Sequence, residues 1–153
     1  MSIAAISSTS VNKTKLYTPA LLKLAVSLAD YPLVASYPFK AEARSRICGS
    51  VVAVSLVSDR KGCVTAVGIR ASACAVGQAA AALFARAAIG REAASIGATR
   101  AQLANWLNGA GAMPDWPDLD MLSATLPYTG RHSAILLPWE AAVQALSIEP
   151  EAD

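Results

Sequence analysis

Residues 47–78 read ICGSVVAVSLVSDRKGCVTAVGIRASACAVGQ, and this stretch decides which fold the chain can adopt. Its β-branched run at 51–57 predicts one strand, and the run at 63–69 predicts another. The turn-forming residues 58–62 between the two runs predict an antiparallel hairpin. In a regular hairpin the outer ends of both strands lie at the same edge of the sheet, so residues that flank the hairpin should come together.

Two cysteines flank this predicted hairpin. Cys48 precedes Gly49, which lets the backbone turn and leaves the sulfur accessible. Cys74 opens an Ala-rich segment at 74–89 that predicts a helix, and the positive end of a helix dipole favours a thiolate. Two neighbouring thiols suit metal, sulfur or iron–sulfur chemistry, although free cysteines are also common as packing residues. We expect Cys63, inside the second strand, to be such a core residue.

Length and composition predict one globular domain. The chain has 153 residues, 54% of them hydrophobic, which is enough to bury a core. We expect the domain to cover 13–148, with tails at 1–12 and 149–153. The net charge of +2 and the scattered basic residues argue against a nucleic-acid partner. The uncharged stretch 71–85 is too short for a membrane span.

The cysteine count and the N-terminal sequence bear on the compartment. Three cysteines are an odd number, and no basic region followed by an apolar core is visible at the start. We therefore expect free thiols in a reducing compartment, which indicates the cytoplasm.

The rest of the chain predicts mainly helices. Thr18 is a suitable N-cap and Pro19 a suitable first residue for the first of them. The expected elements are a helix within 16–28, a loop at 30–40, a helix at 74–89, a helix that starts at a capping box at 99–102 and ends at 107, a turn-rich insert at 108–117, a short helix at 118–125 and a last helix at 133–146. Strands that precede helices indicate an α+β fold, with a small antiparallel sheet packed against several helices.

His132 is the single histidine of the chain. Such a residue before a helix is usually a surface or capping group, but beside two cysteines it is a candidate third ligand. We interpret Ser133 as the N-cap of the last helix. The sequence holds no CxxC pair, no phosphate-binding glycine loop, no HExxH and no nucleophile elbow, so neither a typical zinc site nor a hydrolase is indicated.

Several segments together resemble the iron–sulfur scaffold proteins of the IscU, SufU and NifU N-terminal type. Leu16-Tyr17 is similar to the start of the family's first helix, and Cys48-Gly49-Ser50 is similar to its Cys-Gly-Asp motif. Cys74 follows at a similar spacing, with Gly62 in the hairpin turn. Residues 131–141, RHSAILLPWEA, resemble the last motif, in which a cysteine follows an arginine by three residues. The segment after Cys74 is closer to the SufU branch.

The resemblance implies a site and also shows where this chain departs from it. The family's three cysteines and one aspartate hold zinc or a nascent cluster. Cys48 and Cys74 match the first two cysteines, whereas Ser50 stands at the aspartate position. The third cysteine falls on Ala134, or on Ser133 if the alignment slips by one residue. Two of four ligands are therefore missing, and His132 is the nearest substitute.

The function that the resemblance implies is iron–sulfur cluster assembly without enzymatic activity. Cys48 would accept sulfur from a cysteine desulfurase, Cys74 would be a second ligand, and a transient iron–sulfur cluster or zinc would be held before delivery to recipient proteins. A homodimer could share four thiols between two chains. Two alternatives stay open: a diverged interaction protein that binds no metal, and a redox protein in which Cys48 and Cys74 form a reversible disulfide.

Overall fold

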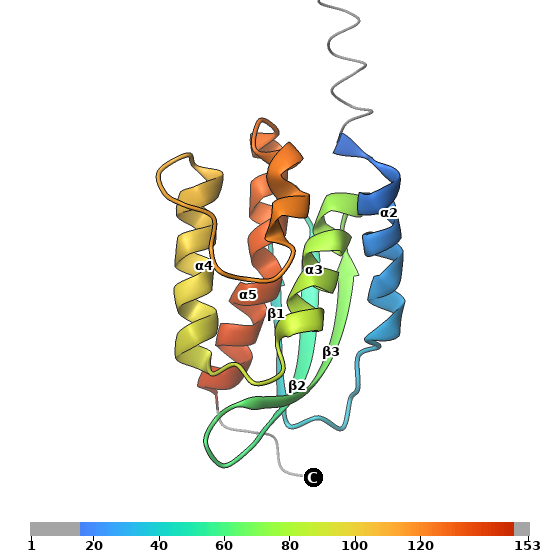
Figure 1. Ribbon diagram of the computed structural model, residues 1–153. Coiled ribbons are helices and arrows are strands. Elements are labelled where there is room, and N and C mark those ends of the chain that lie inside the picture. Colours follow the sequence, from blue (N-terminus) through green and yellow to red (C-terminus); the bar gives the residue numbers. More distant parts are fainter. Residues whose placement is uncertain (1–15, 149–153) are drawn as a thin grey trace, which may run out of the picture.

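A computed structural model describes residues 16–148 and shows a three-stranded sheet beside a group of helices (Figure 1). The strands are β1 (Phe39–Arg44), β2 (Val51–Ser58) and β3 (Val64–Ser72), in that order across the sheet. The α-helices are α2 (Pro19–Val26), α3 (Ala75–Ala87), α4 (Ala93–Leu107) and α5 (His132–Ser147), and the 3₁₀ helices are η1 (Ser27–Asp30), η2 (Leu119–Thr125) and η3 (Thr129–Arg131). The tails expected at 1–12 and 149–153 lie outside the described residues.

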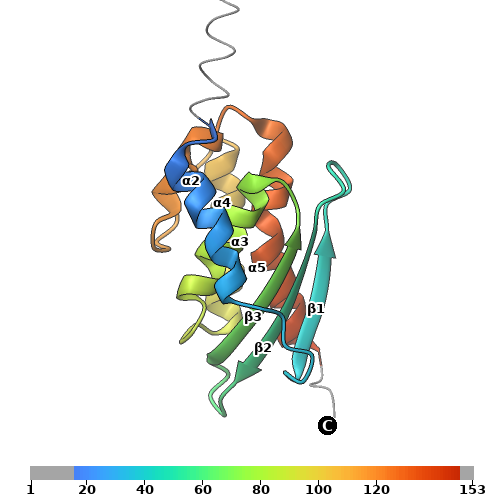
Figure 2. The same ribbon diagram turned by 90° about the vertical axis from the view of Figure 1, so that its right-hand side faces the viewer.

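The helices cover one face of the sheet, as the view along its edge shows (Figure 2). Helix α5 packs on β1 and β2, and α3 packs on β3. Helix α2 lies against α3, and α4 lies against α5. The predicted α+β class is confirmed. No helix within residues 16–148 combines the length and the apolar character that crossing a membrane requires.

The predicted hairpin is formed by β2 and β3, which pair antiparallel from Val51 opposite Ser72. Alternate residues of β2, namely Val52, Val54 and Leu56, are buried in the core under the helices. On the opposite face the segment before β1 crosses the sheet, where the Val34 N–H donates to the hydroxyl of Ser55 at 3.0 Å. This hydrogen bond attaches the segment before β1 to strand β2.

Helix α2 begins as its sequence predicts. The Thr18 hydroxyl accepts the Leu21 N–H at 3.1 Å, and Pro19 occupies the first helical turn. Helix α3 is almost entirely buried because its small alanines, including Ala79 and Ala82, let neighbouring elements approach closely. Cys74 is its N-cap residue.

Two predictions about elements were wrong. The loop expected at 30–40 ends at residue 38, and residues 39–44 form β1, a strand that was not predicted and that contains no β-branched residue. It forms because its backbone pairs along β2 and because Ala43 and its neighbours pack under α5. The capping box at 99–102 is not a helix start, because α4 already begins at Ala93 and the Thr99 hydroxyl donates to the Ser95 carbonyl at 3.0 Å.

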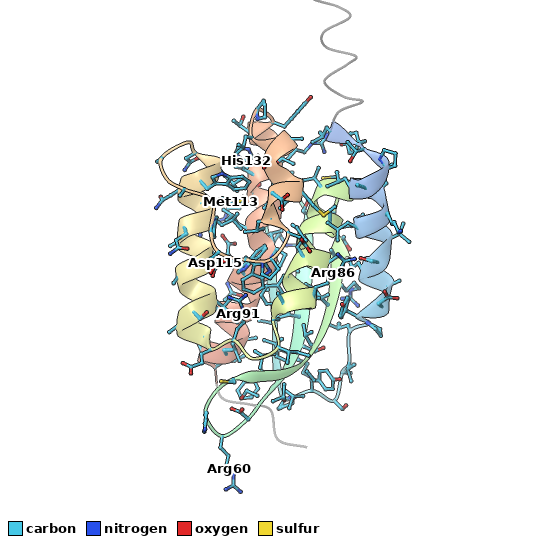
Figure 3. The ribbon with its side chains drawn as sticks, in the orientation of Figure 1. Arg60, Arg86, Arg91, Met113, Asp115 and His132 are labelled. Carbon is cyan, nitrogen blue, oxygen red and sulfur yellow. The ribbon has the colours of Figure 1, made fainter. Side chains whose placement is uncertain are left out.

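An aromatic cluster joins the turn-rich insert to the helices. Phe84 of α3 stacks on Trp116 with ring centroids 5.6 Å apart, and both rings contact Trp139 of α5 edge-on. The Trp116 indole N–H donates to the Leu83 carbonyl at 2.9 Å. The Arg91 guanidinium covers the outer side of Trp116 at 4.2 Å (Figure 3). This cluster holds α3 and α5 in a fixed relation.

Candidate functional site

Cys48 and Cys74 line one pocket of about 290 Å³, as the hairpin geometry predicts. The pocket lies where the β1–β2 loop, the β3–α3 junction and the start of α5 meet. Its other lining residues are Gly49, Ser50, Ser72, Ala73, Gly130, Arg131 and Ala134. No aspartate or glutamate is among these lining residues, so the pocket contains two thiols and one guanidinium as its ionisable groups.

The β1–β2 loop presents Cys48 at the surface. Ser45 and Ser50 close the loop, because the Ser45 N–H donates to the Ser50 carbonyl at 2.8 Å. Gly49 has a φ of +73°, a conformation that favours glycine, and this supports the predicted role of Gly49 in the turn. The Cys48 side chain is exposed, while Ser45 and Ser50 on both sides of the loop are buried.

Three serine hydroxyls surround the sulfur of Cys48. Its Sγ lies 3.1 Å from Ser50 Oγ, 3.4 Å from Ser45 Oγ and 3.9 Å from Ser133 Oγ. Burial raises the pKa of this thiol, but hydrogen bonds with these hydroxyls and with the Ser50 backbone outweigh it and lower the pKa from 9.0 to about 7. A substantial fraction of Cys48 is therefore a thiolate at neutral pH.

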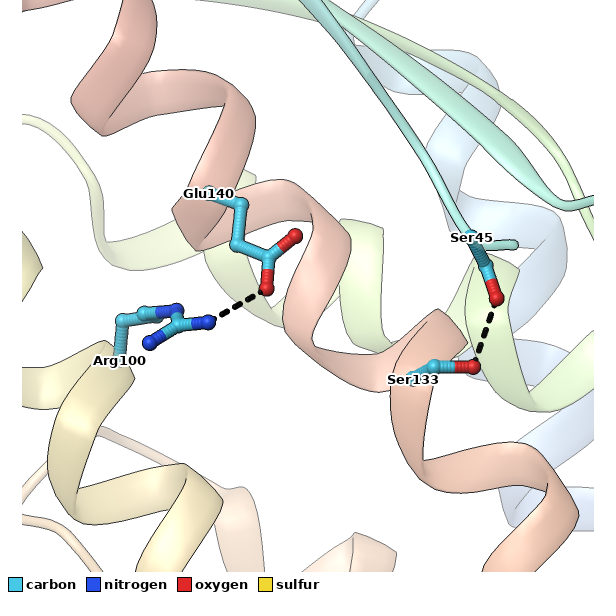
Figure 4. Close-up of polar contacts among 4 residues, drawn as sticks. All are labelled: Ser45, Arg100, Ser133 and Glu140. Carbon is cyan, nitrogen blue, oxygen red and sulfur yellow. Dashed lines mark hydrogen bonds and ion pairs between the residues drawn. The ribbon is translucent and has the colours of Figure 1, made fainter. Parts of the chain in front are cut away.

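Ser45 is a site residue that the sequence did not reveal, and its partner is Ser133, one of the two positions at which the resemblance places the third cysteine. Their hydroxyls are 2.7 Å apart and join the end of β1 to the first turn of α5 (Figure 4). We predicted Ser133 to be the N-cap of the last helix, and this was wrong. Arg131 is the N-cap residue of α5, and the Ser133 hydroxyl is hydrogen-bonded to the Ser45 hydroxyl instead of capping the helix. A separation of 88 residues hides the pair from sequence reasoning.

Cys74 faces Arg131 across the pocket. Burial lowers the pKa of the Arg131 guanidinium, but its hydrogen bond and charge interaction with Cys74, together with Tyr17, raise the pKa above its ordinary value. The guanidinium also lies 5.9 Å from the centre of the Tyr17 ring. Within residues 16–148, no carboxylate lies within ion-pair distance of Arg131.

Gly77 packs against Ala73 and Ala134, two residues that line the pocket. An added Cβ at this position would lie 2.7 Å from the Ala73 Cβ and 3.4 Å from the Ala134 Cβ. The missing side chain therefore lets the first turns of α3 and α5 approach closely. As a result Ala134, at the position where the resemblance places the third cysteine, lines the same pocket as the two thiols.

The structure does not bring His132 to the two thiols. The residue is buried, and its Nε2 lies 3.0 Å from the backbone carbonyl oxygen of Thr125 at the end of η2. Figure 3 shows His132 on the side of the molecule that holds α4. Because the helical turn directs Ala134 to the pocket and His132 away from it, the predicted third ligand is not part of this site.

Cys63 also differs from its prediction as a core residue inside a strand. It lies just before β3, is only half-buried, and forms an isolated bridge with Glu92. Burial, followed by the charges of Asp59 and Glu92, raises the pKa of its thiol. This position is at the turn end of the hairpin, opposite the edge that holds Cys48 and Cys74.

The donor set does not fit a metal ion held by a single chain. Zinc and iron–sulfur sites in proteins use about four ligands, mainly thiolate and imidazole. Across residues 16–148, no three side chains of the His, Cys, Asp or Glu type gather where they could hold a metal ion. Ser50 and Ala134 occupy the positions at which the resemblance expects the two missing ligands.

Comparisons with known proteins show which solved structures have a similar fold. No protein-family model and no curated protein matches the sequence. Among solved structures, the N-terminal part of a nitrogen-fixing NifU-like protein from Brucella abortus is similar, with a TM-score of 0.79 and 28% identity. The match covers 88% of this chain and 94% of that one.

A second similar structure is a protein from Fervidobacterium islandicum AW-1 that is assigned as an iron–sulfur cluster assembly scaffold of the SUF system. Its TM-score is 0.74 at 17% identity, over 88% of this chain and 98% of that one, and it supports the fold alone. The resemblance predicted from the motifs is thus confirmed: over most of its length this chain has the fold of the NifU-like and SufU scaffold structures.

Proposed function

We propose that this protein takes part in iron–sulfur cluster assembly by accepting sulfur on Cys48 from a cysteine desulfurase. The observation that carries the proposal is the exposed Cys48 sulfur, surrounded by three hydroxyls that lower its pKa to about 7, on a scaffold-type fold. The similarity to NifU-like and SufU structures supports a scaffold role. The reduced ligand set favours sulfur acceptance over retention of metal by one chain.

The chemistry requires only a thiolate and access. The Cys48 thiolate attacks the outer sulfur of the desulfurase persulfide, R–S–SH, and a new S–S bond forms. The old S–S bond breaks, and its electron pair leaves with the desulfurase sulfur as a thiolate. Cys48 then holds a persulfide, and no external oxidant or reductant is consumed. The protein transfers sulfur onward to recipient proteins and is not itself an enzyme in this proposal.

Transfer of labelled sulfur tests this role. Purified protein is mixed with a cysteine desulfurase and ³⁵S-cysteine, and protein-bound label is measured after removal of small molecules under non-reducing conditions. We expect roughly one label per chain, lost in Cys48→Ala because the accepting thiolate is gone. Cys63→Ala is the matched control, since this thiol lies at the other end of the hairpin, and it should retain the label. Label that persists in Cys48→Ala would refute the assignment of Cys48.

Metal and acid-labile sulfide content of protein purified without oxygen tests the cluster-holding part. We expect the isolated chain to retain little zinc or iron. A homodimer that shares Cys48 and Cys74 between two copies would instead show about one metal site per dimer, lost in both alanine variants, with a matching increase in size on addition of iron and sulfide. That result would favour the scaffold role over sulfur acceptance alone.

A thiol redox function is the second candidate, and the shared pocket of Cys48 and Cys74 favours it. Mild oxidation of the purified protein distinguishes the two. A disulfide would protect both thiols from alkylation and would be reversed by dithiothreitol. Continued alkylation of both thiols after oxidation would exclude this candidate.

A further inference from the structure

The pocket beside Cys48 contains one permanently charged side chain, and that side chain is a cation. Its lining includes the Arg131 guanidinium and no carboxylate. Among residues 16–148 Arg131 interacts with Cys74 and Tyr17, and no carboxylate pairs with its guanidinium. A guanidinium in this situation presents N–H donors in a planar fork that fits a small oxyanion.

The backbone around the pocket adds to this preference. Helices α3 and α5 both begin at the pocket, after Cys74 and Arg131 respectively, and neither start has a side-chain cap. At α5 the preceding η3 already accepts the His132 N–H at the Thr129 carbonyl. The first N–H groups of α3 and the dipoles of both helices favour negative charge nearby. Figures 1 and 2 show both helix starts at the same end of the molecule. The helix starts thus add to the attraction of an anion, whereas the Arg131 guanidinium is the side chain that would bind the anion directly.

The two departures from the resembled family strengthen the argument. Ser50 stands where an aspartate is expected, and Ala134 stands where a cysteine is expected, and both line the pocket. Each replacement removes a group that would be negatively charged as a metal ligand. What remains is a pocket that repels anions less and attracts them through Arg131.

We propose that this pocket binds a small anionic donor of sulfane sulfur, and that Arg131 holds the anionic end while Cys48 accepts the sulfur. The inference rests on the proposed function of Cys48 and adds a second, protein-independent source of sulfur. The volume of about 290 Å³ lies at the low end for ligand pockets and suits a molecule of a few heavy atoms. Thiosulfate and the persulfide of free cysteine share this chemistry.

The transfer step balances for both donors. With thiosulfate, the Cys48 thiolate attacks the outer sulfur, the S–S bond breaks, and its electron pair leaves with sulfite. With cysteine persulfide, the same attack releases the cysteine thiolate. In each case Cys48 ends with one added sulfur and no oxidant is needed.

Single-turnover transfer from thiosulfate tests the inference, measured as sulfite release and as a mass increase of one sulfur atom on Cys48. We expect saturable transfer in the natural protein, with sulfate as a competitor that cannot donate sulfur. Arg131→Gln should raise the half-saturating thiosulfate concentration roughly tenfold or more with a smaller effect on the maximal rate, because a charge-assisted contact is lost. The half-saturating concentration of Arg131→Lys should lie between those of the natural protein and Arg131→Gln.

The matched control is Arg60→Gln, since Arg60 lies at the tip of the β2–β3 turn, far from the pocket (Figure 3). Its thiosulfate transfer should equal that of the natural protein. A parallel assay with cysteine persulfide shows which of the two small donors is preferred. Circular dichroism and thermal unfolding check that the Arg131 variants fold, and sulfate competition in the natural protein tests the anion site if they do not.

The outcomes separate this inference from the proposed function. Transfer from a desulfurase without transfer from either small donor would overturn the inference and leave the proposed function standing. Absence of transfer from every donor would refute both. Thiosulfate transfer that is insensitive to Arg131 substitution and to sulfate would overturn the anion site.

Discussion

At the scale of single residues, the hydroxyl of Ser133 contributes, after those of Ser45 and Ser50, to the lowered pKa of Cys48. The Cys48 pKa of about 7 lies below its unfolded value of 9.0, so the thiolate stabilises the folded state at high pH, and this stabilisation is lost as the pH falls from 9.0 through 7. The rate of Cys48 alkylation by iodoacetamide should therefore rise with pH around a midpoint of about 7.

Ser133→Ala should move this midpoint upward and slow alkylation at pH 7 about two- to threefold, since the lost hydrogen bond is long and close to solvent. Ser133→Thr keeps a hydroxyl and serves as the control. Identical pH profiles for the natural protein and Ser133→Ala would show that this hydroxyl does not act on the sulfur.

At the scale of the elements, substitution by alanine at two glycines should change the free energy of unfolding in opposite directions. A Cβ on Gly68 in β3 would collide with the Pro32 carbonyl oxygen and lie 2.7 Å from Ser55 Oγ. The segment that crosses the sheet would have to move, so Gly68→Ala should lower the free energy of unfolding by about 1–3 kcal/mol. Urea unfolding followed by circular dichroism measures the change.

Gly97 in α4 is the matched case. An added Cβ there would meet the Val143 side chain at an ordinary 3.8 Å. Because alanine is favoured over glycine inside a helix, Gly97→Ala should raise the free energy of unfolding by about 0.5–1 kcal/mol. Equal effects at both positions would contradict the close approach at Gly68.

At the scale of the whole molecule, three separate chain segments form one pocket, so a metal site should be recoverable. Ser50→Asp combined with Ala134→Cys would place two new ligands beside Cys48 and Cys74. We expect this double variant to bind about one zinc per chain and to gain about 4 kcal/mol of stability when free zinc exceeds the Kd about 1000-fold.

Zinc content by mass spectrometry and thermal unfolding with and without zinc measure this gain. Ser50→Asp combined with Ser133→Cys tests the alternative alignment, since Ser133 also approaches the Cys48 sulfur. If neither double variant binds zinc, the four positions do not converge as the structure places them.

Local sequence was sufficient for the hairpin, the capped start of α2, the start of α3 and the α+β class. These features depend on neighbours along the chain: the β-branched run of β2, the Thr18–Pro19 cap and the alanines after Cys74. The sequence also predicted that Cys48 and Cys74 come to the same site, because an antiparallel hairpin brings its outer ends together, and both line one pocket.

Long-range packing decided the remaining features. Strand β1 has weak strand propensity and forms because β2 and α5 offer it hydrogen bonds and a buried surface. His132 and Ala134 are two residues apart, and only the rotation of α5 decides which of them faces the thiols. Ser45 and Ser50, which lower the Cys48 pKa most, lie within three residues of the thiol, whereas the Ser133 hydroxyl reaches Ser45 and the Cys48 sulfur only through tertiary packing across more than 80 residues.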